Sequence, residues 1–97
     1  MKDKSTIRER FEAFHSANPQ VYEILLKMTW DLHRKGKRRV GIKMLWEVVR
    51  WQVETGELVT TNQFRLNNVF TSRYARLIAA SDPLLAKIFE QRRLVAE

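Results

Sequence analysis

Hydrophobic residues recur at three- and four-residue spacing along most of the chain, which is the period of amphipathic helices. The pattern predicts five helices, from about Thr6 to Ala17, from Pro19 to about Lys35, from Gly41 to about Thr55, from Asn68 to about Ala80 and from Leu84 to about Arg93. We therefore predict a mainly α fold, a compact bundle of about five short helices.

Residue types typical of helix ends support these boundaries. Thr6 or Ser5 suits the N-cap of the first helix. Asn18-Pro19 and Asp82-Pro83 each place a capping residue before a proline at the first helical position, where the missing N–H costs nothing. Two glycines are expected to end the second and third helices, Gly36 and Gly56.

Sparse glycine and proline and the absence of repeats indicate one domain over residues 1–97. We expect residues 1–5 to be disordered and residues 94–97 to be frayed. The segment 64–66, Phe-Arg-Leu, is extended in character and is predicted to pair with Arg39-Val40 as a minimal two-stranded wing.

The third predicted helix has two apolar faces. Its core stripe is Ile42, Leu45, Trp46, Val49 and Val53. On nearly the opposite side lie Met44, Val48 and Trp51, with a narrow polar strip between the two faces. Such a helix is either central to the fold or half covered by a partner.

Lysine and arginine outnumber acidic residues 18 to 11, for a net charge of +7, which favours polyanionic partners. Half of the positive charge falls in two stretches without any acid, one between Asp31 and Glu47 and one between Glu57 and Asp82. The absence of cysteine fits a reducing compartment, so we expect a cytoplasmic protein. The longest apolar runs are too short for a signal peptide or a membrane span.

Catalytic and metal-binding groups are scarce in the sequence. His15 and His33 are the only histidines, they stand far apart, and each is expected to be solvated or to cap a helix. Three glycines in all cannot build a phosphate-cradling loop. We therefore predict a binding protein and no enzyme, with no catalytic residue, no metal ligand and no cofactor.

The fourth predicted helix has the chemistry of a DNA reader. Small side chains let a backbone enter the major groove, while arginine reads guanine edges and asparagine or serine reaches bases or phosphates. The predicted base-contacting residues are Asn68, Ser72, Arg73 and Arg76. Alternatively, the small residues Ala75 and Ala79 permit tight helix packing and the arginines are ordinary surface.

The basic turn, residues 34–43, suits contacts to phosphates, which position a protein without reading sequence. The predicted phosphate contacts are Arg34, Lys37, Arg38, Arg39 and Lys43. With this turn, the predicted helices 41–55 and 68–80 resemble a helix-turn-helix plan. Helix 41–55 is the support and helix 68–80 is the reader. The connection between these two helices, about twelve residues, is much longer than the usual turn of three or four residues. Double-stranded DNA is the predicted partner.

Two alternatives use the second apolar face of the third helix. Met44, Val48 and Trp51 could anchor a protein partner, with the basic surface against an acidic or nucleic-acid-mimicking patch of that partner, because tryptophan is a dominant residue of protein interfaces. The same three residues could instead join two copies as a homodimer. Trp46, on the main core stripe, is expected to be structural.

Most of the chain, roughly residues 11–94, resembles a group of small proteins encoded by bacteriophages, prophages and mobile elements. The resemblance is carried by Phe14-His15, Asn18-Pro19, Val21-Tyr22, Ile42-Lys43, Val49-Arg50-Trp51, and the segments 64–68 and 71–77. It implies a phage or mobile-element protein in the cytoplasm of a bacterial host cell. In that setting, a small DNA-binding regulator and an inhibitor of a host or defence protein are both expected. It assigns no activity and no site residue.

Overall fold

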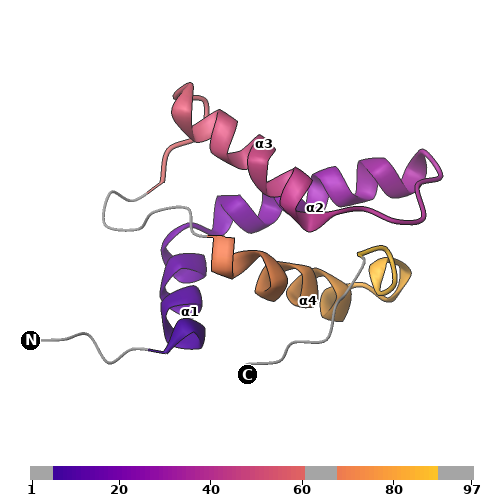
Figure 1. Ribbon diagram of the computed structural model, residues 1–97, viewed down its shortest axis with the longest axis horizontal. Helices are drawn as coiled ribbons and strands as arrows, with labels where there is room; N and C mark the ends of the chain where they lie inside the picture. Colours follow the sequence, from indigo (N-terminus) through magenta and orange to yellow (C-terminus); the bar gives the residue numbers. More distant parts are fainter. Residues whose placement is uncertain (1–5, 61–67, 90–97) are drawn as a thin grey trace, which may run out of the picture.

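The computed structural model describes residues 6–60 and 68–89, and these residues are mainly helical (Figure 1). The described residues form four α-helices, α1 (Ile7–Ala17), α2 (Pro19–Arg34), α3 (Ile42–Glu54) and α4 (Thr71–Ser81). Two short 3-10 turns accompany α4, η1 (Asn68–Phe70) before it and η2 (Pro83–Leu85) after it. The all-α class predicted from hydrophobic spacing is thus confirmed, as are the ends of the first three helices to within a residue or two.

The helix ends show why these boundaries arise. Thr6 forms a capping box with Glu9, in which the Thr6 hydroxyl accepts from the Glu9 amide at 3.1 Å and Glu9 Oε1 accepts from the Thr6 amide at 2.8 Å. Gly36 and Gly56 follow α2 and α3 with φ of 87° and 84°, a left-handed conformation that favours glycine. Asn18 precedes α2 as expected, but its buried side chain donates to the Phe14 carbonyl at the end of α1 and makes no cap bond to α2.

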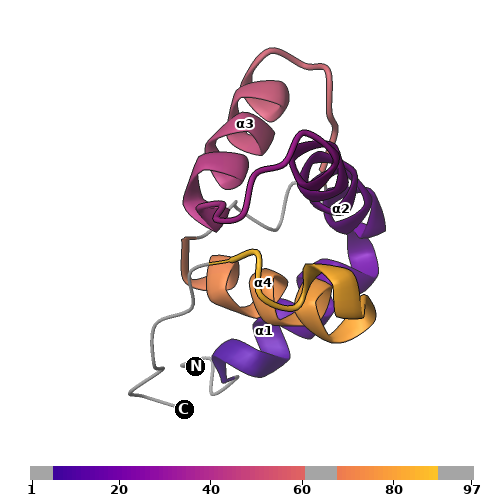
Figure 2. The ribbon, with the colours of Figure 1, turned by 90° about the vertical axis from the view of Figure 1, so that its right-hand side faces the viewer.

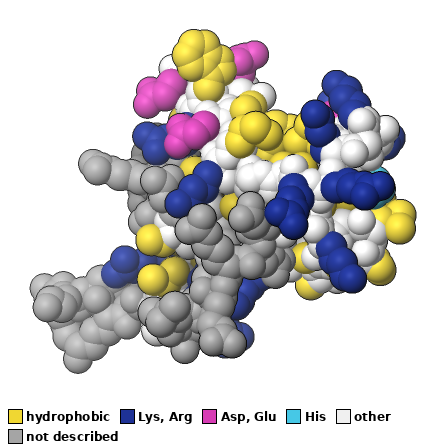
Figure 3. Space-filling model, turned by 45° about the vertical axis from the view of Figure 1, so that its right-hand side comes forward, with side chains coloured by type: hydrophobic (Ala, Val, Ile, Leu, Met, Phe, Trp, Pro, Cys, Tyr) yellow, Lys and Arg dark blue, Asp and Glu magenta, His cyan; other side chains and the backbone are white. Residues whose placement is uncertain are grey.

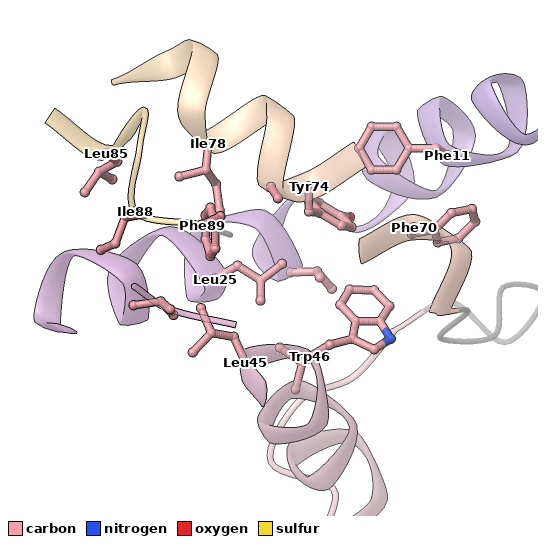
Figure 4. Packing of buried hydrophobic residues seen from close by; sticks show 14 of the residues in the cluster. Phe11, Leu25, Leu45, Trp46, Phe70, Tyr74, Ile78, Leu85, Ile88 and Phe89 are labelled. Carbon is pink, nitrogen blue, oxygen red and sulfur yellow. The ribbon is translucent and has the colours of Figure 1, made fainter. Parts of the chain in front are cut away.

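The four helices enclose one core. In Figure 2, α2 and α3 lie side by side above α4, and α1 lies beneath it. Figure 4 shows Trp46 of α3 close to Tyr74 of α4, with Phe11 of α1 beyond Tyr74. The Phe70 ring packs against Phe11 and Phe14 of α1, with centroids 5.8 Å and 5.3 Å apart. The ring centroids of Phe11 and Tyr74 are 4.8 Å apart in an edge-to-face arrangement, and those of Trp46 and Tyr74 are 5.6 Å apart.

One face of α3 is buried and the other is exposed. Leu45, Trp46 and Val49 are buried, which confirms the structural role predicted for Trp46. Met44, Val48 and Trp51 expose 55%, 38% and 68% of their surface. No other described residue therefore covers the second apolar face, and within the described part of the chain α3 is not buried on both sides.

The predicted fifth helix from Leu84 to Arg93 is wrong over its described part. Asp82 and Pro83 do open a helical turn, with Asp82 Oδ1 accepting from the Leu84 amide at 3.0 Å. The chain then turns and forms an isolated parallel β-bridge between Phe89 and Val40. The Ile88 carbonyl accepts from the Val40 amide at 2.8 Å, so the backbone at this point pairs with another segment and does not continue a helix.

The start of α4 also differs from expectation. An α-helix was predicted from Asn68, whereas residues 68–70 form the 3-10 turn η1 and the N-cap, Phe70, makes no side-chain cap bond. The predicted wing segment 64–66, the predicted disordered residues 1–5 and the frayed end 94–97 lie outside the described residues. The predicted wing partner, Val40, pairs with Phe89. None of the described helices has the length and apolar character needed to cross a membrane.

Candidate functional site

The basic turn is fixed at both of its ends by main-chain hydrogen bonds. At the end of α2, the Lys37 amide donates to the Leu32 carbonyl at 3.0 Å, and the Gly36 amide donates to the His33 carbonyl at 3.0 Å. At the other end, the buried Val40 is joined to Ile88 and Phe89. The side chains between these points are therefore carried by a backbone of defined shape.

All the basic side chains of this turn are exposed. They are Arg34, Lys35, Lys37, Arg38, Arg39 and Lys43, and no acidic residue lies between Asp31 and Glu47. Arg34 forms an ion pair with Asp31, an acidic residue that lies one helical turn earlier on α2. In Figure 3, lysine and arginine side chains gather over the right-hand part of the molecule, where the end of α2 and the basic turn come forward. Lys35, which we did not predict to contact phosphate, belongs to the same surface.

The predicted reader helix, α4, has its small-residue flank partly inside the protein. Ala75 is only 4% exposed and packs in the core beside Tyr74 and Ile78. Ser72 and Arg73 are half-buried, whereas Arg76 and Ala80 are exposed. At Ala75, therefore, the small side chain permits close helix packing, which was the alternative interpretation of this flank.

Arg73 and Arg76 face α1. They line a shallow hollow together with Arg8, Phe11 and Glu12 of α1 and Leu77 of α4. In Figures 1 and 2, α1 lies at the end of the molecule away from the turn between α2 and α3. The structure thus does not bring the two predicted DNA-contacting groups together. Sequence reasoning missed Arg8 and Glu12 as their neighbours because only the fold brings α1 beside α4.

The exposed apolar face of α3 adjoins the basic turn. Lys43 connects the two surfaces, because it is the last residue of the basic turn and directly precedes Met44 on α3. Figure 3 shows hydrophobic side chains along the upper edge of the molecule, over α3, with acidic side chains beside them. The charged residues of α3 are Lys43, Glu47, Arg50 and Glu54, and all four are exposed.

A cluster of polar aromatic side chains lies between α1, α2 and α4. The His15 ring, predicted to be solvated or capping, instead stacks on Phe11 and meets Tyr22 and Tyr74 edge to face. Among the described residues, His15 Nδ1 and the Tyr74 hydroxyl are buried without a hydrogen-bond partner. Burial raises the pKa of Tyr74 above the ordinary tyrosine value. Tyr22 differs, since its hydroxyl donates to Ser81 Oγ at 2.9 Å.

The described residues contain no group of three or more histidine, cysteine, aspartate or glutamate side chains placed to hold a metal ion. Comparison of the chain with protein-family models, curated proteins and solved structures gave no match. The resemblance to phage and mobile-element proteins therefore stays a prediction.

Proposed function

We propose that this protein binds the phosphate backbone of double-stranded DNA through the basic turn, residues 34–43. The observation that carries the proposal is a segment of six exposed cationic side chains with no acid among them, held on a backbone tied down at both ends. Such a surface attracts a polyanion and releases its condensed counterions. Phosphate contacts of this kind position a protein on a duplex and do not read its sequence.

The α4 reader is left out of this proposal. Arg73 and Arg76 lie beside α1, away from the basic turn, and Ala75 is used in the core. A sequence-reading role for Asn68, Ser72, Arg73 and Arg76 stays a prediction. It requires a second DNA contact on the opposite side of the molecule.

The test is a duplex-binding titration by fluorescence anisotropy over a salt series. We expect the logarithm of the association constant to fall linearly with the logarithm of salt concentration. Neutralising three turn residues, Lys37→Gln with Arg38→Gln and Arg39→Gln, should lower the slope by about 2 to 3, because each lost phosphate contact removes about 0.9. Duplexes of unrelated sequence should bind equally well.

A matched control removes the same charge elsewhere, with Arg10→Gln, Lys27→Gln and Lys87→Gln, all exposed outside the turn. This control should keep most of the slope. Equal losses in the two triple variants would show only the effect of net charge and would contradict the assignment to the turn. If only the double variant Arg73→Gln with Arg76→Gln lost duplex binding, the DNA-binding surface would be α4 and not the basic turn. If the wild type did not bind duplex DNA at low salt, neither surface would bind DNA.

A further inference from the structure

Three of the seven large hydrophobic side chains exposed among the described residues lie on one face of α3. The two borders of this face differ in charge. On a helix of 100° per residue, Met44, Val48 and Trp51 fall within about 60° of one another. The four charged residues of α3 occupy the adjoining strip of about 60°, on one side of the apolar stripe only. On the other border lies Gln52, which is uncharged.

Along this charged border the signs alternate. From the N-terminal end of α3, the order is Lys43, Glu47, Arg50 and Glu54. Within one chain the only ion pair described among these four is between Arg50 and Glu47, at 3.9 Å and largely exposed. A pair so long and so exposed stabilises the helix little and can exchange partners at small cost.

We infer that this face of α3 binds the same face of a second copy of the chain, with the two helices antiparallel. In an antiparallel pair related by a two-fold axis, like borders face each other and residue i meets residue j while j meets i. With the axis crossing α3 between Val48 and Val49, Lys43 faces Glu54 of the second copy and Glu47 faces its Arg50. All four charges of each helix then face an opposite charge.

The apolar stripe fits the same register. Val48 meets Val48 of the second copy near the axis, and Met44 lies against the second copy's Trp51. Thioether groups pack favourably on aromatic rings, and tryptophan is a common anchor of interfaces. A parallel pair would place the charged border opposite the Gln52 border, where it finds no counter-charge. The second copy is therefore favoured by charge complementarity as well as by apolar area.

The arrangement leaves the basic turn free. The turn precedes α3, so a dimer carries one basic turn at each end of a paired helix about 20 Å long. DNA binding and dimerisation use different side chains, apart from Lys43. The dimer can therefore form whether or not the protein binds DNA, and the two proposals are tested separately.

The first test is sedimentation of the full chain from about 5 µM to about 500 µM at near-physiological salt, where an interface of one short helix is expected to dissociate at tens of micromolar. Trp51→Ser should weaken the dimer by about 10-fold or more. Leu84→Ser is the matched control, because Leu84 is 66% exposed and lies in η2, which packs on α2 and α4. A wild-type chain that stays monomeric over the whole range would overturn the proposal.

The second test concerns register and uses charge reversal. Glu47→Arg places two arginines opposite each other across the interface, and Arg50→Glu places two glutamates there, so each variant alone should dimerise about 5-fold or more weakly. Mixing the two variants pairs arginine with glutamate at both positions and should restore association. Mixing without recovery would reject the antiparallel register. Neither residue belongs to the basic turn, so DNA binding by the monomer should be kept.

A third test uses the absence of cysteine from the chain. Val48→Cys should form an intermolecular disulfide under mild oxidation, because position 48 lies at the axis within the reach of a disulfide. Met44→Cys is the control, because in an antiparallel pair the two copies of position 44 are separated by about 13 Å along the helix axis. Equal cross-linking at both positions would indicate a parallel pair and contradict the proposal.

Discussion

Val40 and Phe89 form a parallel β-bridge that joins the end of the basic turn to the segment after η2. Both side chains are buried, and the Val40 amide donates to the neighbouring Ile88 carbonyl at 2.8 Å. The turn therefore depends on packing at a distant point of the chain. The consequences of this and of three other features can be measured.

Truncating Phe89 should destabilise the whole domain. Phe89→Ala removes a buried aromatic ring from the core and is expected to lower the free energy of unfolding by about 3–5 kcal/mol. Urea denaturation followed by circular dichroism measures the change. Val59→Ala, at a side chain that is 76% exposed, should change stability by less than about 0.5 kcal/mol. Similar values for both variants would mean that Phe89 is not a core residue.

Two tyrosines should respond in opposite ways to loss of the hydroxyl. Tyr74→Phe removes a buried hydroxyl that has no partner among the described residues, so the variant should be as stable as the wild type or more stable by up to about 1 kcal/mol. Tyr22→Phe breaks the hydrogen bond to Ser81 and should cost up to about 1 kcal/mol. Thermal and urea unfolding of both variants provide the comparison. A clear loss of stability in Tyr74→Phe would point to a partner for its hydroxyl.

Stability should decline at high pH because of Tyr74. Its burial raises the pKa of the folded form, while in the unfolded chain the phenol ionises near its ordinary value of about 10. Above about pH 10 the unfolded state therefore binds fewer protons than the folded state, and the free energy of unfolding falls by up to about 1.4 kcal/mol per pH unit from this group. Below about pH 10 the contribution is constant.

Unfolding measured between about pH 9 and about pH 11 for the wild type and Tyr74→Phe isolates this effect, because every other titrating group is shared. The wild type should lose stability more steeply than the variant. Parallel pH profiles would contradict a raised pKa at Tyr74.

Two alanines of α4 should tolerate enlargement differently. Ala75→Leu overfills a packed core and is expected to cost about 1–3 kcal/mol, whereas Ala80→Leu, at an exposed position of the same helix, should be nearly neutral. Both variants keep the charge and add the same side chain. If the two had equal stability while Ala75→Leu alone weakened DNA binding, the small residue at position 75 would serve DNA contact after all.

The local structure was largely predictable because its signals are local. The capping pair of Thr6 and Glu9, the glycines after α2 and α3 and the three- to four-residue spacing of apolar side chains act within one or two helical turns. The two-faced character of α3 was visible for the same reason. The end of the chain after η2 was mispredicted because Phe89 pairs with a residue far away in sequence, and such pairing overrides helical spacing.

The sequence by itself determined the all-α class, the ends of α1, α2 and α3, the cluster of cations in the basic turn and the apolar face at Met44, Val48 and Trp51. Helical period states which side chains share a face, but it does not state which element covers that face. Only the tertiary structure decided that Ala75 is packed and Ala80 is exposed, that Arg73 and Arg76 lie beside α1, and that no other described residue covers the second face of α3. Those outcomes depend on how the helices pack, because burial is a property of neighbours that contact in space and stand apart along the chain.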